Sequence, residues 1–276
     1  DEASEILKRP ILGSISQYGK ANDSYADRLI QNNMNSRLPD EYRILRTNLL
    51  FSTEISSGIY IVTSAIPNEG KTTVISNLAG SLALSGLHVL LIDADLRKPQ
   101  LHNVFGLDNS QGLTSLLTAS LAPNQISTSS TLENGASDPA STLTWQDTIK
   151  QIKDINNLWV LPSGFPIDNP TELLGSTIMK NWIQAIQENL HFDVILIDTP
   201  PLLGFPDSAV MSVSLGAKMI LVVRANKTRH EAAKRMIERL DQVQAEIIGI
   251  ILNQTNSRDE GYQAYDYYID YYTNTT

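Results

Sequence analysis

The sequence predicts an α/β fold in which a mostly parallel sheet is covered by helices on both faces. Six short, uniformly apolar runs are typical of buried strands, and segments with helical spacing separate them. The chain has 276 residues, 42% of them hydrophobic, which is enough to bury one substantial core. Its formal net charge of -9 argues against a nucleic-acid partner.

The first segment, residues 1–38, is polar and weakly patterned, so we expect a tether with a turn at residues 10–13. The chain begins at Asp1 rather than at a methionine, and no apolar run approaches the roughly 18 residues that span a bilayer. We therefore expect this chain to be the end of a longer protein with a membrane segment upstream. The absence of cysteine excludes disulfides, thiolate metal sites and cysteine nucleophiles.

A helix is expected from Pro39, a residue that suits a helix start. Asp40 and Glu41 suit the positive end of the helix dipole, and Leu45 and Leu49 share one face.

The strands and helices that follow are expected to alternate along the chain. The strands are residues 59–63, 89–92, 158–161, 194–197, 219–223 and 247–252. The first helix among them covers residues 71–85, because Val74, Leu78 and Leu82 recur every four residues, and Gly86 ends it. Two further helices are expected near residues 171–189 and 228–243.

Residues 119–147 interrupt this alternation. They are rich in Ser, Thr, Asn and Pro and nearly free of large apolar side chains until Trp145. We interpret them as a mobile surface insertion, and a regulatory or substrate-contacting loop is the alternative.

The strongest motif follows the first of these strands, where Gly70, Lys71 and Thr72 open a helix. In the phosphate-binding pattern G-x-x-x-x-G-K-[ST], Ala65 stands in place of the first glycine. Successive backbone N–H groups and the helix N-terminus would still form an anion site, with Lys71 near the β- and γ-phosphates and the Thr72 hydroxyl on Mg²⁺. The alternative is a Gly-Lys pair that only caps a helix. The predicted nucleotide-binding residues of this loop are Pro67, Asn68, Glu69, Gly70, Lys71, Thr72 and Thr73.

Three carboxylates lie at strand ends on the same predicted sheet edge, which makes the chain a P-loop NTPase candidate. Asp93 and Asp95 follow one apolar strand, and Asp198 follows another. Mg²⁺ prefers oxygen ligands, and Asp93 or Asp95 could also accept a proton from an attacking hydroxyl. Arg97 could orient Asp95 or touch phosphate; solvated strand ends are the alternative. The predicted metal ligands are Thr72, Asp93, Asp95 and Asp198, and the predicted catalytic residues are Lys71, Asp93, Asp95 and Asp198.

Two polar residues near the last strands are weaker candidates for nucleotide binding. Asn253 follows the final strand and could lie near the base, and Arg224 follows the strand before it. Both could equally be ordinary turn residues.

The C-terminus, residues 258–276, concentrates tyrosine. Six of the ten tyrosines fall within eleven residues without a helical or alternating stripe, so we expect a flexible tail that offers phenols to an active site. These tyrosines are Tyr262, Tyr265, Tyr267, Tyr268, Tyr271 and Tyr272.

Together these segments resemble the bacterial tyrosine kinases. The Walker A, Walker A′ and Walker B motifs of that family look like residues 65–72, 90–97 and 194–200, and Asp-x-Asp-x-Arg after three apolar residues is the most specific match. The resemblance implies a kinase domain at residues 39–257 that uses ATP and Mg²⁺ and phosphorylates the tail in trans.

The family also carries a helical Glu-x-x-Arg-x-x-Arg motif that builds a ring of subunits. Arg43 and Arg46 match its arginines, whereas Asp40 stands where the family has Glu. The resemblance therefore implies a ring-like homo-oligomer, and the shorter carboxylate puts its stability in question. Without the resemblance, the arginines form an exposed helix face.

The resemblance further implies partners and a location. The family regulates the synthesis and export of extracellular polysaccharide at the cytoplasmic face of the bacterial inner membrane. It works with a membrane-spanning activator, in cis or in trans, and with a protein-tyrosine phosphatase.

Two other functions fit the same loop. A ParA/MinD-like ATPase would act as a nucleotide-dependent assembly switch, but its signature lysine is Ile66 here, and six terminal tyrosines have no use in it. The second alternative is an assembly module that binds ATP without transferring phosphate. The intact Lys71, Thr72, Asp93 and Asp198 argue against it.

Overall fold

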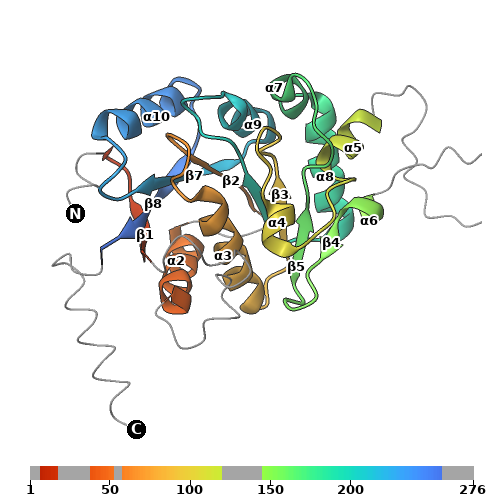
Figure 1. The fold of residues 1–276 in the computed structure, drawn as a ribbon, viewed down its shortest axis with the longest axis horizontal. Coiled ribbons are helices and arrows are strands. Elements are labelled where there is room, and N and C mark those ends of the chain that lie inside the picture. The colour runs from red at the N-terminus through yellow and green to blue at the C-terminus, as the bar shows by residue number, and fades with distance from the viewer. Residues whose placement is uncertain (1–6, 18–37, 53–57, 120–144, 257–276) are drawn as a thin grey trace, which may run out of the picture.

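The computed structural model describes residues 7–17, 38–52, 58–119 and 145–256, and these form the predicted α/β architecture (Figure 1). The strands are β1 (Ile11–Ser16), β2 (Gly58–Ser64), β3 (Val89–Asp93), β4 (Lys150–Gln151), β5 (Leu158–Leu161), β6 (Val194–Asp198), β7 (Lys218–Arg224) and β8 (Ile247–Thr255). The helices are α2 (Leu38–Ser52), α3 (Lys71–Leu84), α4 (Leu101–Phe105), α5 (Leu113–Ala119), α6 (Trp145–Thr148), α7 (Pro170–Leu174), α8 (Thr177–Leu190), α9 (Asp207–Leu215) and α10 (His230–Gln242).

The strands form one sheet in the order β1-β8-β7-β2-β6-β3-β5-β4. The short strand β4 pairs antiparallel with β5, and the other neighbours are parallel. β2 therefore lies between β6 and β7, which follow it much later in the chain. The strand order therefore reverses at this place in the sheet. In open α/β sheets, ligands bind where the strand order reverses, beyond the carboxyl ends of the strands.

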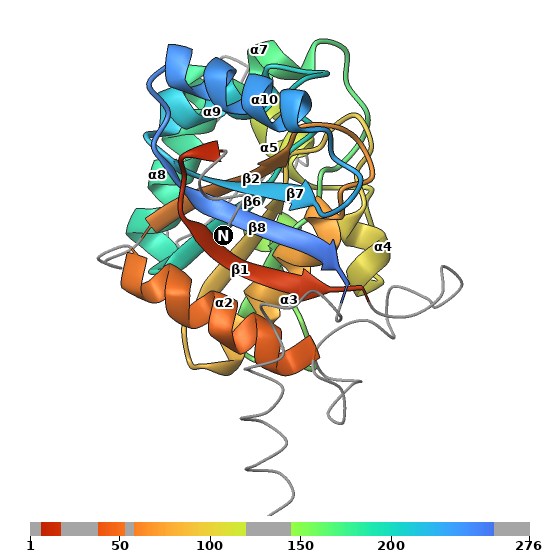
Figure 2. The ribbon, with the colours of Figure 1, turned by 90° about the vertical axis from the view of Figure 1, so that its left-hand side faces the viewer.

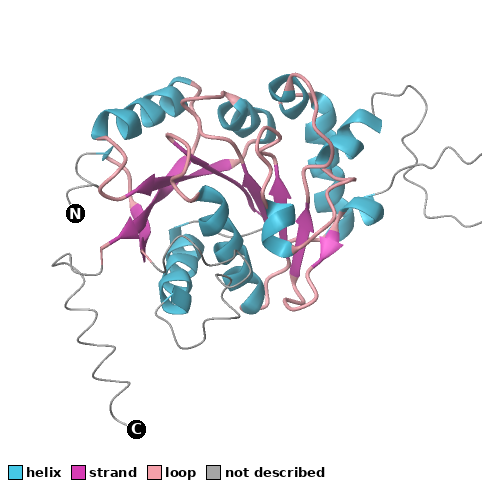
Figure 3. Ribbon diagram, in the orientation of Figure 1, coloured by secondary structure: helices cyan, strands magenta, loops and turns pink. Residues whose placement is uncertain are grey.

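Two apolar layers lie on opposite faces of the sheet, with helices over each (Figure 3). Successive strand residues alternate between them: Ile61 belongs to the layer under α5, α8, α9 and α10, whereas Val62 belongs to the layer under α2, α3 and α4. Both side chains are fully buried. Leu45 and Leu49 of α2 face the second layer, as their spacing predicts.

The prediction of a turn at residues 10–13 is wrong, because residues 11–16 form β1, which pairs parallel with β8 (Figure 2). Leu12 and Ile15 are buried under α2. Gly13 lets α2 approach, since a Cβ there would lie 3.3 Å from Leu45 Cδ1. The first segment thus contributes an edge strand that its weak apolar pattern did not reveal.

The helix expected near residues 171–189 is two helices, α7 and α8. Gly175 ends α7, and Ser176 begins α8 by accepting a hydrogen bond from the Met179 N–H at its side-chain oxygen. The helices expected at 71–85 and 228–243 are confirmed as α3 and α10, within two residues at each end.

Several predicted segments lie outside the described residues. These are most of the tether, residues 120–144 of the insertion, and the tyrosine-rich tail. The end of the insertion forms α6. Within the part of the chain that the structure describes, no helix is long and apolar enough to cross a membrane.

Candidate active site

The site begins where β2 leads through residues 65–70, here called the phosphate loop, into α3. Asn68 and Gly70 both have left-handed backbone conformations, with φ of 65° and 88°. A Cβ at Gly70 would lie 2.1 Å from Asn253 Nδ2 and would displace that amide, and its φ is one that residues with a side chain rarely adopt. The sequence therefore needs glycine at the position that turns the loop into the helix.

The N-terminus of α3 is open to an anion. Its first turn contains no acidic residue, and the preceding residue is Gly70, which has no side chain that could cap the helix. The unpaired N–H groups and the helix dipole favour negative charge at this point. The geometry at the start of α3 therefore favours an anion.

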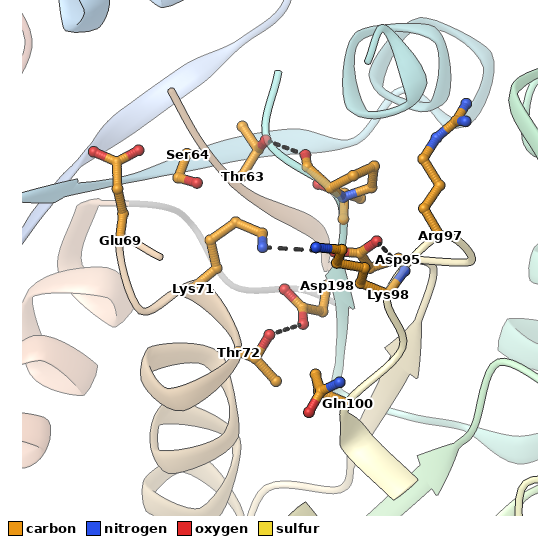
Figure 4. A network of polar contacts seen from close by, with 12 residues as sticks. Thr63, Ser64, Glu69, Lys71, Thr72, Asp95, Arg97, Lys98, Gln100 and Asp198 are labelled. Carbon is orange, nitrogen blue, oxygen red and sulfur yellow. Dashed lines mark hydrogen bonds and ion pairs between the residues drawn. The ribbon is translucent and has the colours of Figure 1, made fainter. Parts of the chain in front are cut away.

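Lys71 and Thr72 extend from this turn toward two acidic strand ends (Figure 4). Lys71 Nζ lies 3.7 Å from Asp95 Oδ2, and both side chains are largely buried. The Thr72 hydroxyl donates a 2.6 Å hydrogen bond to Asp198 Oδ2. The structure thus brings together four of the residues that the sequence predicted for the site.

The surroundings of Asp198 are suited to a bound cation. Burial raises the pKa of its carboxyl to about 6, while the charge of Lys71 and the Thr72 hydrogen bond oppose that rise. Its Oδ1 atom is buried and has no hydrogen-bond partner. A buried carboxylate oxygen without a partner, beside a threonine hydroxyl, fits the oxygen ligands and retained waters of Mg²⁺.

Asp93 lies next to Asp198 in the register of β3 and β6. Its Oδ2 accepts hydrogen bonds from the N–H groups of Gln100 and Leu101 at 3.0 and 2.9 Å, and its Oδ1 accepts one from the Asp95 N–H at 3.3 Å. Burial, and then the charge of Asp198, raise the pKa of Asp93 to about 8. Backbone amides thus occupy both oxygens, which favours a role in holding residues 94–101 in place.

Asp95 lies between Lys71 and the backbone of residue 98. Burial raises the pKa of its carboxyl above the usual value, and the charge of Lys71 counteracts this. Its Oδ1 accepts a hydrogen bond from the Lys98 N–H at 3.0 Å. Among the described residues, no group of three or more His, Asp or Glu forms a complete metal site.

Arg97 occupies a position that the sequence did not predict. Its Nε lies 3.1 Å from Asp207 Oδ2, its Nη2 donates to the Thr171 hydroxyl at 3.0 Å, and its guanidinium stacks 3.9 Å above the Phe205 ring. Figure 4 shows Arg97 directed away from Lys71. Asp207 was not found from the sequence, because it lies 110 residues beyond Arg97 and no local motif marks it.

The two weaker candidates both contact the phosphate loop. Asn253 Nδ2 donates to the Glu69 carbonyl at 2.8 Å, and Arg224 Nη1 donates to the Asn68 carbonyl at 3.4 Å. Both hydrogen bonds hold the backbone of the phosphate loop.

The residues predicted for ring formation lie on α2, away from the loop. Arg43 forms an exposed ion pair with Asp40 at 2.6 Å, three residues earlier on the same helix. Arg46 donates to the Ser81 carbonyl of α3 at 2.8 Å. Asp40 and Arg43 are therefore paired within one chain, and Arg46 braces α2 against α3.

Known proteins resemble this chain in sequence. The family model described as "AAA domain" matches residues 68–254. Tyrosine-protein kinase YwqD of Bacillus subtilis is 35% identical over 215 residues, which cover 78% of this chain and 80% of that protein. Tyrosine-protein kinase ptk of Acinetobacter johnsonii is 30% identical over 81% of this chain, and the match spans only 27% of that longer protein.

Solved structures share its fold. The chimerical protein CapA2B2 has a TM-score of 0.76 at 28% identity, over 92% of this chain and 98% of the other. The kinase domain of Escherichia coli tyrosine kinase ETK has a TM-score of 0.74 at 27% identity, over 92% and 94% of the two chains. The cell division ATPase MinD of Pyrococcus furiosus, at 23% identity and a TM-score of 0.54, shares the fold alone.

Proposed function

Because the chain belongs to the bacterial tyrosine kinases, we propose that it transfers the γ-phosphoryl group of ATP to tyrosine hydroxyls, including those of its own C-terminus. The observation that carries the proposal is the pair of contacts at the start of α3. Thr72 binds Asp198, and Lys71 lies beside Asp95, directly next to a helix N-terminus suited to phosphate.

Each residue of this arrangement has a distinct role in the proposed transfer. The ammonium group of Lys71 and the N–H groups of the phosphate loop neutralise charge on the phosphates. The Thr72 hydroxyl and Asp198 would hold Mg²⁺, which would supply further charge neutralisation. Asp95 Oδ2, beside Lys71, accepts the proton that the tyrosine hydroxyl loses.

The proposed substrate is the tyrosine cluster of a neighbouring copy in a ring-like oligomer. Six phenols so close together offer several acceptors to one site. Each phosphate adds about -1.5 to -2 charges, to a tail that already carries Asp266 and Asp270. Phosphorylation is therefore expected to weaken tail docking and ring assembly.

The wider setting is proposed from family membership. The kinase would act at the cytoplasmic face of the bacterial inner membrane, with a membrane-spanning activator in cis or in trans. A protein-tyrosine phosphatase would reverse the modification, and the cycle would regulate the synthesis and export of exopolysaccharide.

The proposal is tested by incubating the protein with γ-labelled ATP and Mg²⁺ and mapping phosphotyrosine. We expect label on the tail, its loss in Lys71→Met, and its retention in Lys234→Met. The control removes an exposed lysine of α10 that pairs with Glu238 on the same helix. ADP formation without phosphotyrosine would instead favour an ATPase that works as an assembly switch.

Transfer between copies is tested by mixing one chain that lacks activity with another that lacks the tail. One is the Lys71→Met chain with its tail, and the other is an unmutated chain shortened to residue 257. Label on the longer chain supports transfer in trans, whereas label that appears only in intact, unmutated chains shows transfer within one copy.

A further inference from the structure

Glu69 is an unexpected residue in a loop that must receive a polyanion. Its residue surface is only 1% exposed, although Pro67 and Asn68 beside it are exposed. A negative charge close to phosphate opposes phosphate binding by Coulomb repulsion. Glu69 must therefore make a favourable contribution that offsets this repulsion.

The carboxylate is directed back under the loop, where donors surround it. Figure 4 shows it directed away from the ammonium group of Lys71. Its Oε2 accepts a 2.7 Å hydrogen bond from the Ile66 N–H, which closes the loop on itself. Its Oε1 accepts hydrogen bonds from the Thr228 hydroxyl and, at 3.4 Å, from the Arg224 N–H.

The loop backbone is held from the same side. The carbonyls of Asn68 and Glu69 accept hydrogen bonds from Arg224 Nη1 and Asn253 Nδ2. Arg224 and Asn253 are opposite each other in the pairing of β7 and β8. The loop is therefore attached to the ends of two neighbouring strands and, through Thr228, to the turn before α10.

These attachments offset a conformational cost. Asn68 has a φ of 65°, a left-handed conformation that few residues with a side chain adopt, although asparagine tolerates it better than most. A loop that reaches this shape only when phosphate arrives would lose binding energy to ordering.

We propose that Glu69 is a positioning residue: its buried carboxylate, held by Thr228 and the Arg224 N–H, keeps the phosphate loop in the shape that receives the phosphates of the nucleotide. The proposal rests on the proposed function, since it refines how that site binds its substrate. Glu69 itself touches no reacting atom.

The test removes the donor and leaves the charge of Glu69 unchanged. Thr228→Val deletes the hydroxyl, Thr228→Ser retains it, and Thr118→Val deletes a half-buried threonine hydroxyl that bonds within α5. Calorimetry with Mg²⁺ measures the affinity for ADP and for inorganic tripolyphosphate, a probe that has phosphates but no base. Thermal unfolding of the nucleotide-free proteins is measured in parallel.

We expect Thr228→Val to weaken both ligands by about tenfold, the order of effect for a lost hydrogen bond to a charged group. Thr228→Ser and Thr118→Val should bind both ligands as the unmutated protein does. In a Glu69→Ala background, the further change Thr228→Val should have a much smaller effect, because only the hydrogen bond that the Thr228 hydroxyl accepts from the Arg224 N–H remains to be lost.

Three results would overturn the proposal: unchanged affinity in Thr228→Val, an equal loss in Thr228→Ser, or weakened ADP binding with unchanged tripolyphosphate binding. If Thr228→Val lowers the melting temperature but leaves the affinity unchanged, the proposal is also overturned. The proposed function fails separately, when the unmutated protein binds ADP normally and never labels tyrosine.

Discussion

At the scale of single residues, the three carboxylates of the site differ in what surrounds them. Asp198 presents an oxygen without a hydrogen-bond partner, Asp95 lies beside Lys71, and Asp93 is held by backbone amides. Equal residue types on neighbouring strand ends therefore have different roles. Only the surroundings, and not the Asp-x-Asp spacing, distinguish them.

The titration of Asp93 predicts a dependence of stability on pH. Its folded-state pKa of about 8 lies above the ordinary value of 3.8, so the folded state binds more protons than the unfolded state between these values. The metal-free protein should therefore lose stability as the pH rises through this window. Asp93→Asn removes the titration, while its amide oxygen can still accept hydrogen bonds from the Gln100 and Leu101 N–H groups.

We expect the unfolding free energy of Asp93→Asn, relative to that of the unmutated protein, to increase steadily between about pH 5 and pH 8. Urea denaturation in the presence of a chelator measures this difference. A difference that stays constant over the window would show that the carboxyl is ionised throughout it.

The residues that sequence reasoning located are those whose chemistry is local. Gly70, Lys71 and Thr72 form one contiguous motif, and Asp198 directly ends an apolar strand. The ion pair of Arg97 with Asp207 was not predicted, because the two residues are distant in the sequence. The contact of Glu69 with Thr228, 159 residues apart, was likewise invisible before the fold was known.

At the scale of elements, short and uniformly apolar runs predicted the central strands well, and β1 was missed. Only Leu12 and Ile15 of β1 are buried, and glycine and serine stand between them. The alternation is too short to distinguish an edge strand from a turn. Its pairing depends instead on β8, more than 230 residues later, where Ile250 donates its N–H to the Pro10 carbonyl at 2.9 Å.

Gly249 of β8 makes that pairing possible. A Cβ at this position would lie 2.6 Å from Leu12 Cγ and 2.9 Å from the Pro10 carbonyl oxygen. We expect Gly249→Ala to displace β1 and to lower the unfolding free energy by about 1–3 kcal/mol. Urea denaturation measures the loss, and hydrogen exchange should show faster exchange of the Ile250 amide.

Gly80 offers the opposite change as a control. It lies inside α3, and a Cβ there would meet only Ile155 Cδ1, at an ordinary 3.5 Å. Gly80→Ala should raise the unfolding free energy by about 0.5–1 kcal/mol. Equal stability of both variants would contradict the role assigned to Gly249.

At the scale of the whole molecule, the two helical layers and the parallel sheet followed from the sequence, but the strand order did not. Strands that are buried on both faces have similar apolar sequences, so composition cannot say which of them are neighbours. The position of β2 between β6 and β7, which creates the site, emerges only when the chain is folded.

Assembly is where the α2 arginines are expected to act. The exposed ion pair of Arg43 with Asp40 stabilises the chain by only about 0.3–0.5 kcal/mol. Arg43 can therefore leave Asp40 and pair with a residue of another subunit at little cost in free energy. We expect Arg43→Glu to shift the oligomer toward monomer in light scattering and to reduce labelling in trans. ADP affinity and melting temperature should stay unchanged.

Arg235→Glu provides the matched control, because it makes the same charge reversal on the exposed face of α10. It should leave the oligomer intact. If both variants dissociate the oligomer equally, net charge rather than the α2 motif controls assembly.

The pairing of β1 with β8 also determines where the tyrosine-rich segment starts. Thr255 lies opposite Ser16 at the carboxyl edge of the sheet, the edge that holds the phosphate loop. Beyond Asn256 the chain has 276 − 256 = 20 residues. With an extended length of about 3.5 Å per residue, Tyr262 can reach at most about 21 Å from that point and Tyr272 about 56 Å. The six phenols therefore differ in the distance they can span: the first can reach only a nearby active site, and the last can reach one more than twice as distant.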